Sequence, residues 1–593
     1  NTALGYNTLQ ANTTGQYNTA LGGNALEAST TASNNVAVGK NALLSNTTGT
    51  NNVAVGAFTL DANTTTSSNT AIGYNALSAN TAAENTAVGV SALEDNTTGT
   101  RNTAMGVDAL QECTTGDDNT ALGYNALENP TTASDNTAVG SYVLTANTTG
   151  ERNTGVGKGA LQSTTTGSQN TAIGMNALYT NSTGSHNTAV GENALSLSTT
   201  ADANTAVGDE ALEANTTGAN NTAVGRQALE ANTTASSNTA VGAAALKVNT
   251  TGTQNVAVGN GALDASNANN CTAIGYNAAG ANTTGTLNTA VGSECFATNT
   301  TGGYNTAVGQ NALNANTTAS NNCAFGQSAL AANTTASSNT AVGKSALAAN
   351  TTGAENVAVG NNAMSVNTTG ASNVAVGRDA LVNSNANYNT AIGALALNDN
   401  TTGTENTAVG AFAHDANTTG GYNVAMGVGA LGANTTGGQN VAIGWEANAI
   451  ETDGSYCTAV GYKALRNTSA AGNSAFGWEA LVDNTTGSMN TGIGKQALRY
   501  GTTAGQNTAV GEQAMEGVSG GTSTGSYNVA VGLRALEGFT TAESNTAIGY
   551  YAMMASTTGN DNTAVGAYAL KDNTASGNTG VGRNAGRALT TGH

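Results

Sequence analysis

The sequence predicts an all-β chain, a parallel β-solenoid of about 35 coils in which each 17-residue repeat forms one coil. The motif Asn-Thr-Ala-Val-Gly, with close variants, occurs 35 times, and of the 34 intervals between its glycines 28 are 17 residues, five are 16 and one is 21. Each motif is a short β-prone run that ends at an obligatory glycine, and an Asn-Thr-Thr-Gly corner follows. A helical hairpin repeat needs about 30 residues or more, so a helical repeat is excluded.

The consensus repeat is N-T-A-V-G-x-x-A-L-x-A-N-T-T-G-x-x, and we number its slots 1 to 17 from Asn1. Slots 2 and 4 share one face of a strand, and slot 4 is apolar in every repeat. Slot 9 is Leu in 27 repeats. We therefore expect slots 4 and 9 to form aliphatic ladders inside the solenoid, and slots 1 and 12 to form Asn ladders. The slot-5 glycine provides a conformation or a close approach that a Cβ would forbid, and Asn12 and Gly15 bracket a second corner.

Slot 3 points away from slots 2 and 4 and is Ala in every repeat except at Gly155, Gly492 and Gly580. A solvent-exposed face drifts toward polar and charged residues, whereas this one stays small. We expect the slot-3 face to pack closely against another chain along the whole length. The alternative is that slot 3 sits tightly inside the coil.

The repeat covers residues 1–593 as one continuous shaft, with an irregular coil around an insertion near 517–522 and no separate globular domain. The pattern is already running at Asn1, so the sequence resembles a piece of something longer. The last residues, Arg587–His593, are expected to be a truncated repeat rather than a cap.

Composition narrows the function. The net charge is −20, from 16 basic and 36 acidic residues, and phosphate binding needs a basic stripe, so we expect no nucleic-acid partner. No run of 18 apolar residues occurs, so we expect no membrane insertion in this segment. The cysteines show no CxxC spacing, which argues against a metal site or a disulfide framework. They are expected to be isolated substitutions or contacts between equivalent cysteines of neighbouring chains: Cys113, Cys271, Cys295, Cys323 and Cys457.

No catalytic arrangement can be proposed. The three histidines, His186, His414 and His593, lie in separate repeats. His414 occupies slot 9, where Leu is expected, so we predict a buried neutral histidine; a local outward turn and a pH-sensitive weak coil are the alternatives. Asn448 and Gly586 also interrupt the Leu ladder. We expect neither an enzyme nor a bound cofactor, because a depolymerase-like solenoid would need a carboxylate cluster on one face and the sequence shows no such concentration.

Slot 6 carries several aromatic residues, which are candidates for contact with a carbohydrate or a protein. The alternative is that they decorate an exposed corner. They are Tyr6, Tyr74, Tyr124, Trp445 and Trp478.

The repeat Asn-Thr-Ala-Val-Gly-x-x-Ala-Leu resembles the YadA-like head repeat of trimeric autotransporter adhesins, and the form with Asn-Thr-Thr-Gly is similar to repeats of phage and bacterial tail-fibre proteins. The resemblance implies a left-handed parallel β-roll, three identical chains side by side, and a fibre projecting from a cell surface or a virion. The adhesin repeat is usually shorter than 17 residues, and no coiled-coil stalk or membrane anchor is visible. We expect an extracellular fibre shaft that forms a homotrimer and contacts a receptor or a glycan.

The main alternative is an ice-binding or other single-chain Thr-rich solenoid. Thr13 and Thr14 are adjacent, so they point to opposite sides and do not form an array with a spacing of two. Slot-2 Thr is often replaced by Val, as at Val36 and Val53, which suits a core position better. Both observations favour the fibre.

Overall fold

Each repeat contributes one three-residue strand, formed by slots 2 to 4. The computed structural model describes residues 1–589, so part of the predicted truncated repeat Arg587–His593 lies outside the described residues. The chain forms two compact units, Asn1–Thr301 and Gly302–His593. The strands of the first unit are β1 (Thr2–Leu4), β2 (Thr19–Leu21), β3 (Val36–Val38), β4 (Val53–Val55), β5 (Thr70–Ile72), β6 (Thr86–Val88), β7 (Thr103–Met105), β8 (Thr120–Leu122), β9 (Thr137–Val139), β10 (Thr154–Val156), β11 (Thr171–Ile173), β12 (Thr188–Val190), β13 (Thr205–Val207), β14 (Thr222–Val224), β15 (Thr239–Val241), β16 (Val256–Val258), β17 (Thr272–Ile274) and β18 (Thr289–Val291).

The second unit has the same strand in each repeat. Its strands are β19 (Thr306–Val308), β20 (Cys323–Phe325), β21 (Thr340–Val342), β22 (Val357–Val359), β23 (Val374–Val376), β24 (Thr390–Ile392), β25 (Thr407–Val409), β26 (Val424–Met426), β27 (Val441–Ile443), β28 (Thr458–Val460), β29 (Ser474–Phe476), β30 (Thr491–Ile493), β31 (Thr508–Val510), β32 (Val529–Val531), β33 (Thr546–Ile548), β34 (Thr563–Val565) and β35 (Thr579–Val581).

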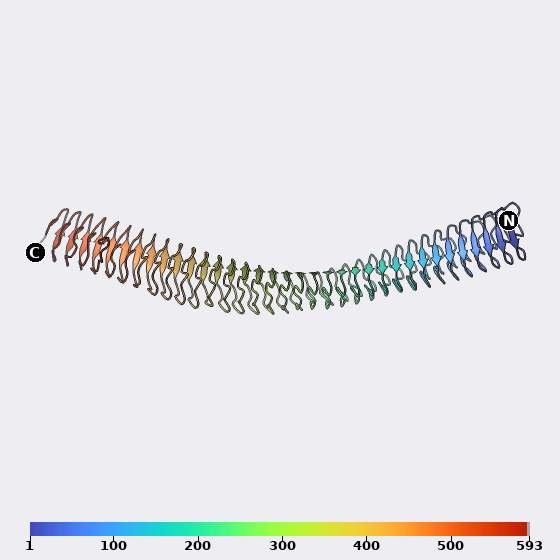
Figure 1. Cartoon of the computed structure of the whole chain (residues 1–593), viewed down its shortest axis with the longest axis horizontal. Helices are drawn as coiled ribbons and strands as arrows, with labels where there is room; N and C mark the ends of the chain where they lie inside the picture. Colours follow the sequence, from blue (N-terminus) through green and yellow to red (C-terminus); the bar gives the residue numbers. More distant parts are fainter. Residues whose placement is uncertain (590–593) are drawn as a thin grey trace. The chain divides into compact units, whose positions relative to one another are not determined.

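Within each unit, consecutive strands pair in parallel, and like slots stand above like slots. β12 and β13 are typical, since Thr188 pairs with Thr205 and Ala189 pairs with Ala206. Figure 1 shows this stacking, with one strand per coil and the turn segments on either side of it. The predicted parallel β-solenoid with a 17-residue repeat is confirmed, whereas the single continuous shaft stays a prediction.

The interior of the coil corrects the assignment of the strand faces. Ala206 in slot 3 is fully buried, as are Ala211 and Leu212 in slots 8 and 9, but Thr205 and Val207 in slots 2 and 4 are partly exposed. The prediction that slot 4 lies inside is therefore wrong, and so is the prediction that slot 3 faces another chain. Slot 9 does form the interior Leu ladder.

The physical reason is the thinness of the coil. A Cβ added to Gly492 would lie 3.1 Å from Leu481 Cδ1, and one added to Gly580 would lie 2.9 Å from Leu570 Cγ. The slot-3 side chains thus pack directly against the slot-9 leucines. The space left beside each Leu accepts a methyl group, and a Val or Ile there would overpack the interior.

The slot-5 glycine is required both for its conformation and for the stacking of coils. Gly208 has a φ of +135°, which L side chains rarely adopt. A Cβ there would also lie 2.6 Å from the carbonyl carbon and oxygen of Gly225 in the next coil. Any other residue in slot 5 would separate two neighbouring coils.

The predicted Asn ladders are confirmed. In slot 1, the backbone N–H of Asn35 donates to Asn18 Oδ1 at 3.0 Å, and that of Asn52 donates to Asn35 Oδ1 at 2.9 Å. In slot 12, Asn63 Nδ2 donates to Asn46 Oδ1 at 3.0 Å. The fully buried amides therefore take part in hydrogen bonds that link each coil to the next, as buried polar groups must.

Changes in repeat length are absorbed in the turn segments. The 21-residue interval lies between β31 and β32, yet Thr508 still pairs with Val529. Asn507 Nδ2 still donates to the carbonyl of Gly525 at 2.9 Å, the bond that Asn18 makes with Ala32 in a regular coil. The strand column and the Asn column thus keep their register across the insertion.

Candidate interaction surfaces

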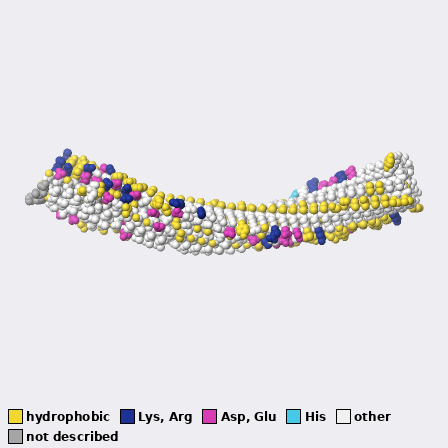
Figure 2. All heavy atoms as spheres, in the orientation of Figure 1, with side chains coloured by type: hydrophobic (Ala, Val, Ile, Leu, Met, Phe, Trp, Pro, Cys, Tyr) yellow, Lys and Arg dark blue, Asp and Glu magenta, His cyan; other side chains and the backbone are white. Residues whose placement is uncertain are grey.

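The outward face of the strands is an extended apolar surface. Slot 4 holds Val, Ile, Leu, Met or Phe in every strand, and slot 2 holds Thr or Val in all strands except β20 and β29. The larger slot-4 side chains are about 40% exposed, for example Met105 at 42% and Ile173 at 42%. Figure 2 shows hydrophobic side chains in continuous rows along the visible side of the Asn1–Thr301 unit. We call the columns formed by slots 2 and 4 the outward sheet face.

One of the five cysteines lies on this face. Cys323 occupies slot 2 of β20 and is partly exposed, while the other four are buried. Cys113 stands in slot 12, Cys271 and Cys457 stand in slot 1, and Cys295 stands in slot 8. The interior positions fit isolated substitutions in small or Asn slots, and burial raises the pKa of Cys113 to about 11.

The predicted contact aromatics are all exposed on the turn segments. Tyr6 is the most exposed, and Tyr74, Tyr124, Trp445 and Trp478 are exposed as well. Whether they contact a ligand stays a prediction.

Two of these aromatics belong to a stack that was not predicted from the sequence. Tyr462 lies between Trp445 and Trp478, with ring-centroid distances of 5.0 and 6.0 Å and nearly parallel planes. Lys463 Nζ lies 4.8 Å from the Trp445 ring centroid. Aromatic residues in slot 6 of three consecutive repeats were the signal for this stack. Because the rings stack face to face on one another, the stack also fits the alternative that these aromatics only decorate an exposed corner.

A buried polar cluster interrupts the interior ladders in the coils of β25 to β27. His414 is fully buried, and its Nε2 lies 3.3 Å from Asn434 Oδ1. His414 is thus buried, and burial lowers its pKa to about 4, which favours the neutral form; that the histidine is neutral stays a prediction. In the next coil but one, Asn448 in slot 9 donates to the buried carboxyl group of Glu451 in slot 12.

The cluster is incompletely satisfied. His414 Nδ1, Asn434 Nδ2, Asn448 Oδ1 and Glu451 Oε1 are buried without a hydrogen-bond partner. Burial raises the pKa of Glu451 to about 7, the Asn448 hydrogen bond opposes this, and nearby Asp453 adds to it. Because these polar groups stand where a regular coil has Leu in slot 9, we expect the coils of His414 and Asn448 to be less stable than regular coils.

An acidic cluster corrects the expectation that no carboxylates gather on one face. Carboxylate oxygens of Glu210, Glu213 and Glu230 lie within 4.8 Å of one another. Lys247 Nζ lies 3.4 Å from Glu230, and Gln227 Nε2 donates to Glu210 at 2.7 Å. Slots 7 and 10 of neighbouring repeats place these side chains together, a pattern visible only once the coils are stacked. Lys247 and Gln227 each contact one carboxylate of the cluster, while burial and then the neighbouring Glu210, Glu230 and Asp209 raise the pKa of Glu213.

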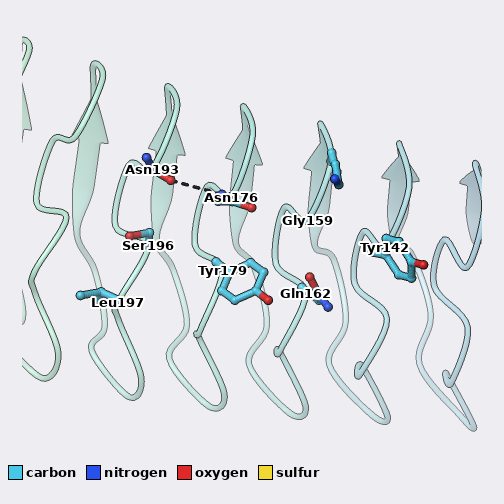
Figure 3. A pocket seen from close by; sticks show the side chains of 9 residues that line it. Tyr142, Gly159, Gln162, Asn176, Tyr179, Asn193, Ser196 and Leu197 are labelled. Carbon is cyan, nitrogen blue, oxygen red and sulfur yellow. Dashed lines mark hydrogen bonds between the residues drawn. The ribbon is translucent and has the colours of Figure 1, made fainter.

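A groove lies on the turn segments of the coils that begin with β9 to β12. It has a volume of about 370 Å³ and is lined by side chains from slots 6, 7, 10 and 11. Figure 3 shows Tyr142 and Tyr179 on either side of Gln162, with Gly159 on the same coil as Gln162. The Asn176–Asn193 hydrogen bond of 3.3 Å lies nearby.

No protein-family model matches this sequence, and no curated protein matches it either. The resemblance to adhesin-head and tail-fibre repeats thus rests on the repeat motif alone. Within the described residues, no helix is long and apolar enough to cross a membrane.

Proposed function

We propose that this chain is the shaft of a structural fibre, in which copies of the chain lie side by side and cover one another's outward sheet face. The observation that carries the proposal is the aliphatic or aromatic side chain that slot 4 presents outward in every strand. Isolated exposed apolar residues need no explanation, but a contiguous apolar face marks an interaction surface. This face replaces slot 3 as the proposed contact between chains.

The periodicity of the face favours a second copy of the chain as its partner. Slot-4 side chains recur once per coil, at the spacing of about 4.8 Å between paired strands. A partner that fills every gap along such a face needs the same spacing, and the chain itself has it. Three copies per fibre, an extracellular location on a cell surface or virion, and a receptor or glycan as target are what the repeat resemblance adds. The proposal includes no catalysis.

Sedimentation tests the proposal directly. We expect a solution mass of three times the 58.0 kDa of one chain. A stable single chain at the same concentration would contradict the proposed self-association.

Charged substitutions on the face sharpen this test. Replacing Val207 and Val224 by Lys puts two charges on the outward sheet face of β13 and β14. We expect this variant to sediment at a lower mass, because burying an unpaired ammonium group costs far more than an apolar contact returns. The control is Asn220→Arg, in the exposed slot 17 where Arg101 and Arg152 already occur with the same backbone conformation. It should leave the mass unchanged.

Cys323 provides a native probe of the same face. We expect its thiol to react slowly with iodoacetamide in the native protein. In a variant that adds Val308→Lys and Val342→Lys to the two lysines above, in the strands that pair with β20, we expect the thiol to react quickly. Rapid labelling of the native protein would show the face to be open.

Ice binding is the second candidate, and one observation favours it. The slot-2 threonines point outward beside slot 4, two residues apart on a regular face, so the sequence argument that placed slot 2 in the core fails. A single-chain mass together with thermal hysteresis would support this candidate. A multimer without thermal hysteresis would support the fibre.

A further inference from the structure

The coil that begins with β10 departs from the repeat at two glycines, and only one of them has a packing explanation. Gly155 in slot 3 follows a coil in which Val143 replaces the usual slot-8 Ala, and a Cβ at Gly155 would lie 2.4 Å from Val143 Cγ1. The larger Val is thus matched by the smaller Gly. Gly159 in slot 7 has no such interior partner, since slot 7 lies on the turn segment.

The missing side chain of Gly159 lets three groups from two coils converge. A Cβ at Gly159 would lie 2.9 Å from Asn176 Oδ1, 3.4 Å from Tyr179 Cδ2 and 3.5 Å from Gln162 Oε1. Other slot-7 glycines do not gather their neighbours in this way. At Gly261 the nearest atom to such a Cβ is Asn277 Oδ1 at 4.0 Å, and at Gly429 it is Glu446 Cγ at 3.7 Å.

We propose that the groove around Gly159 binds a short saccharide. Tyr142 and Tyr179 border the groove from coils two apart, and a phenol ring offers an apolar face for the C–H side of a sugar ring. Between them, the amides of Gln162 and Asn176 supply both donors and acceptors for sugar hydroxyls. The volume of about 370 Å³ lies at the lower end of small-molecule sites, as a sugar of one or two rings needs.

The charge of the lining residues limits the chemical class of the ligand. Lys158 is the one charged residue among those that line the groove, and it is exposed. A neutral saccharide fits the amide and phenol groups, and a sugar carboxylate would pair with Lys158. A phosphate-rich or cationic ligand does not fit a groove with a single lysine.

The groove lies on the turn segments, whereas the proposed contact between chains uses the strands. The lining side chains come from slots 6, 7, 10 and 11, and the outward sheet face uses slots 2 and 4. The site deepens the glycan target of the proposed function, but it does not depend on the proposed contact between chains, and it would stay open with the outward sheet face covered.

The decisive variant is Gly159→Asn. Asn is the residue that slot 7 carries at Asn176 and Asn193, where φ is 54°, so it suits the φ of +71° at Gly159. Its side chain would occupy the point where Asn176, Tyr179 and Gln162 converge. Gly261→Asn, in the same slot of a coil without this groove, is the matched control.

The experiment applies the whole chain and both variants to an array of neutral and carboxylate-bearing oligosaccharides, followed by titration calorimetry with the strongest saccharide. We expect the native chain and Gly261→Asn to bind alike, and Gly159→Asn to bind at least tenfold more weakly. Tyr179→Ala, which removes one aromatic face and leaves the backbone conformation alone, should weaken binding as well. Failure of the native chain to bind any saccharide, or equal binding by Gly159→Asn, would overturn the proposal, whatever the sedimentation mass shows.

Discussion

Two irregular regions of this protein depart from the repeat in different ways. In the coils of β9 and β10, Val143 is too large for slot 8, and the next coil answers with a glycine at Gly155. In the coils of β25 to β27, His414, Asn448 and Glu451 bring polar groups into the interior, and several of their atoms stay without partners. A larger side chain in the interior can be compensated by the loss of one neighbouring methyl group. A polar side chain there needs a complete set of hydrogen bonds.

The largest expected effect concerns the pH dependence of the polar region. The pKa of Glu451 is raised from 4.5 to about 7, so the folded chain binds more protons than the unfolded chain between these values, and stability falls as pH rises through 7. The pKa of His414 is lowered from 6.5 to about 4, so stability falls as pH drops from 6.5 toward 4. Each contribution amounts to about 3 kcal/mol, and the two slopes oppose each other between pH 4.5 and 6.5.

Single variants should separate the two slopes. With His414→Leu, the stability of residues 410–461 should decrease from pH 4.5 to 7.5, and with Glu451→Gln it should increase. Hydrogen exchange of peptides from this region, corrected for the intrinsic pH dependence of exchange, measures both. Asp453 and Cys457 are the other titratable groups that face Glu451, and they stay in place in both variants. Equal slopes in the two variants would contradict the assignment.

The compensated region should show an intermediate effect. Gly155→Ala places a methyl group against Val143 and should cost about 1–3 kcal/mol by overpacking. Val143→Ala in the same chain restores the consensus pair, so the double variant should recover most of this loss. A double-mutant cycle by urea unfolding, read out by hydrogen exchange of residues 137–177, measures the coupling. Additive effects would show that the two side chains do not compensate each other.

The smallest effect is expected on the surface, where a changed side chain neither overpacks the interior nor buries a polar group. Arg101 Nε and Asp118 Oδ1 are 2.6 Å apart on the exposed turn segment. Because solvent screens this pair, Arg101→Ala should produce no measurable change in thermal stability. A clear loss in the same thermal scan would mean that surface contacts between coils matter more than the interior.

The sequence predicted the repeat, the strand in slots 2 to 4, the Leu ladder and both Asn ladders, because each follows from stacking identical residues. It did not predict which strand face is inside. Alternation separates slot 3 from slots 2 and 4, and hydrophobicity favoured Val207 over Ala206 as the interior residue. The deciding quantity was the room left beside Leu212 and its equivalents, which depends on the thickness of the coil. The groove at Gly159 and the cluster of Glu210, Glu213 and Glu230 were missed because they combine residues from several coils.

The kept register of the Asn column has a consequence for inheritance. A regular coil donates to the coil before it and accepts from the coil after it: the N–H of Asn35 donates to Asn18 Oδ1, and Asn35 Oδ1 accepts from the N–H of Asn52. Deleting or duplicating one whole repeat in the gene rejoins surfaces that already match, so recombination between repeats can change the number of coils without new compensating mutations. Only coils with a matched neighbour, such as the Val143–Gly155 pair, must be copied together.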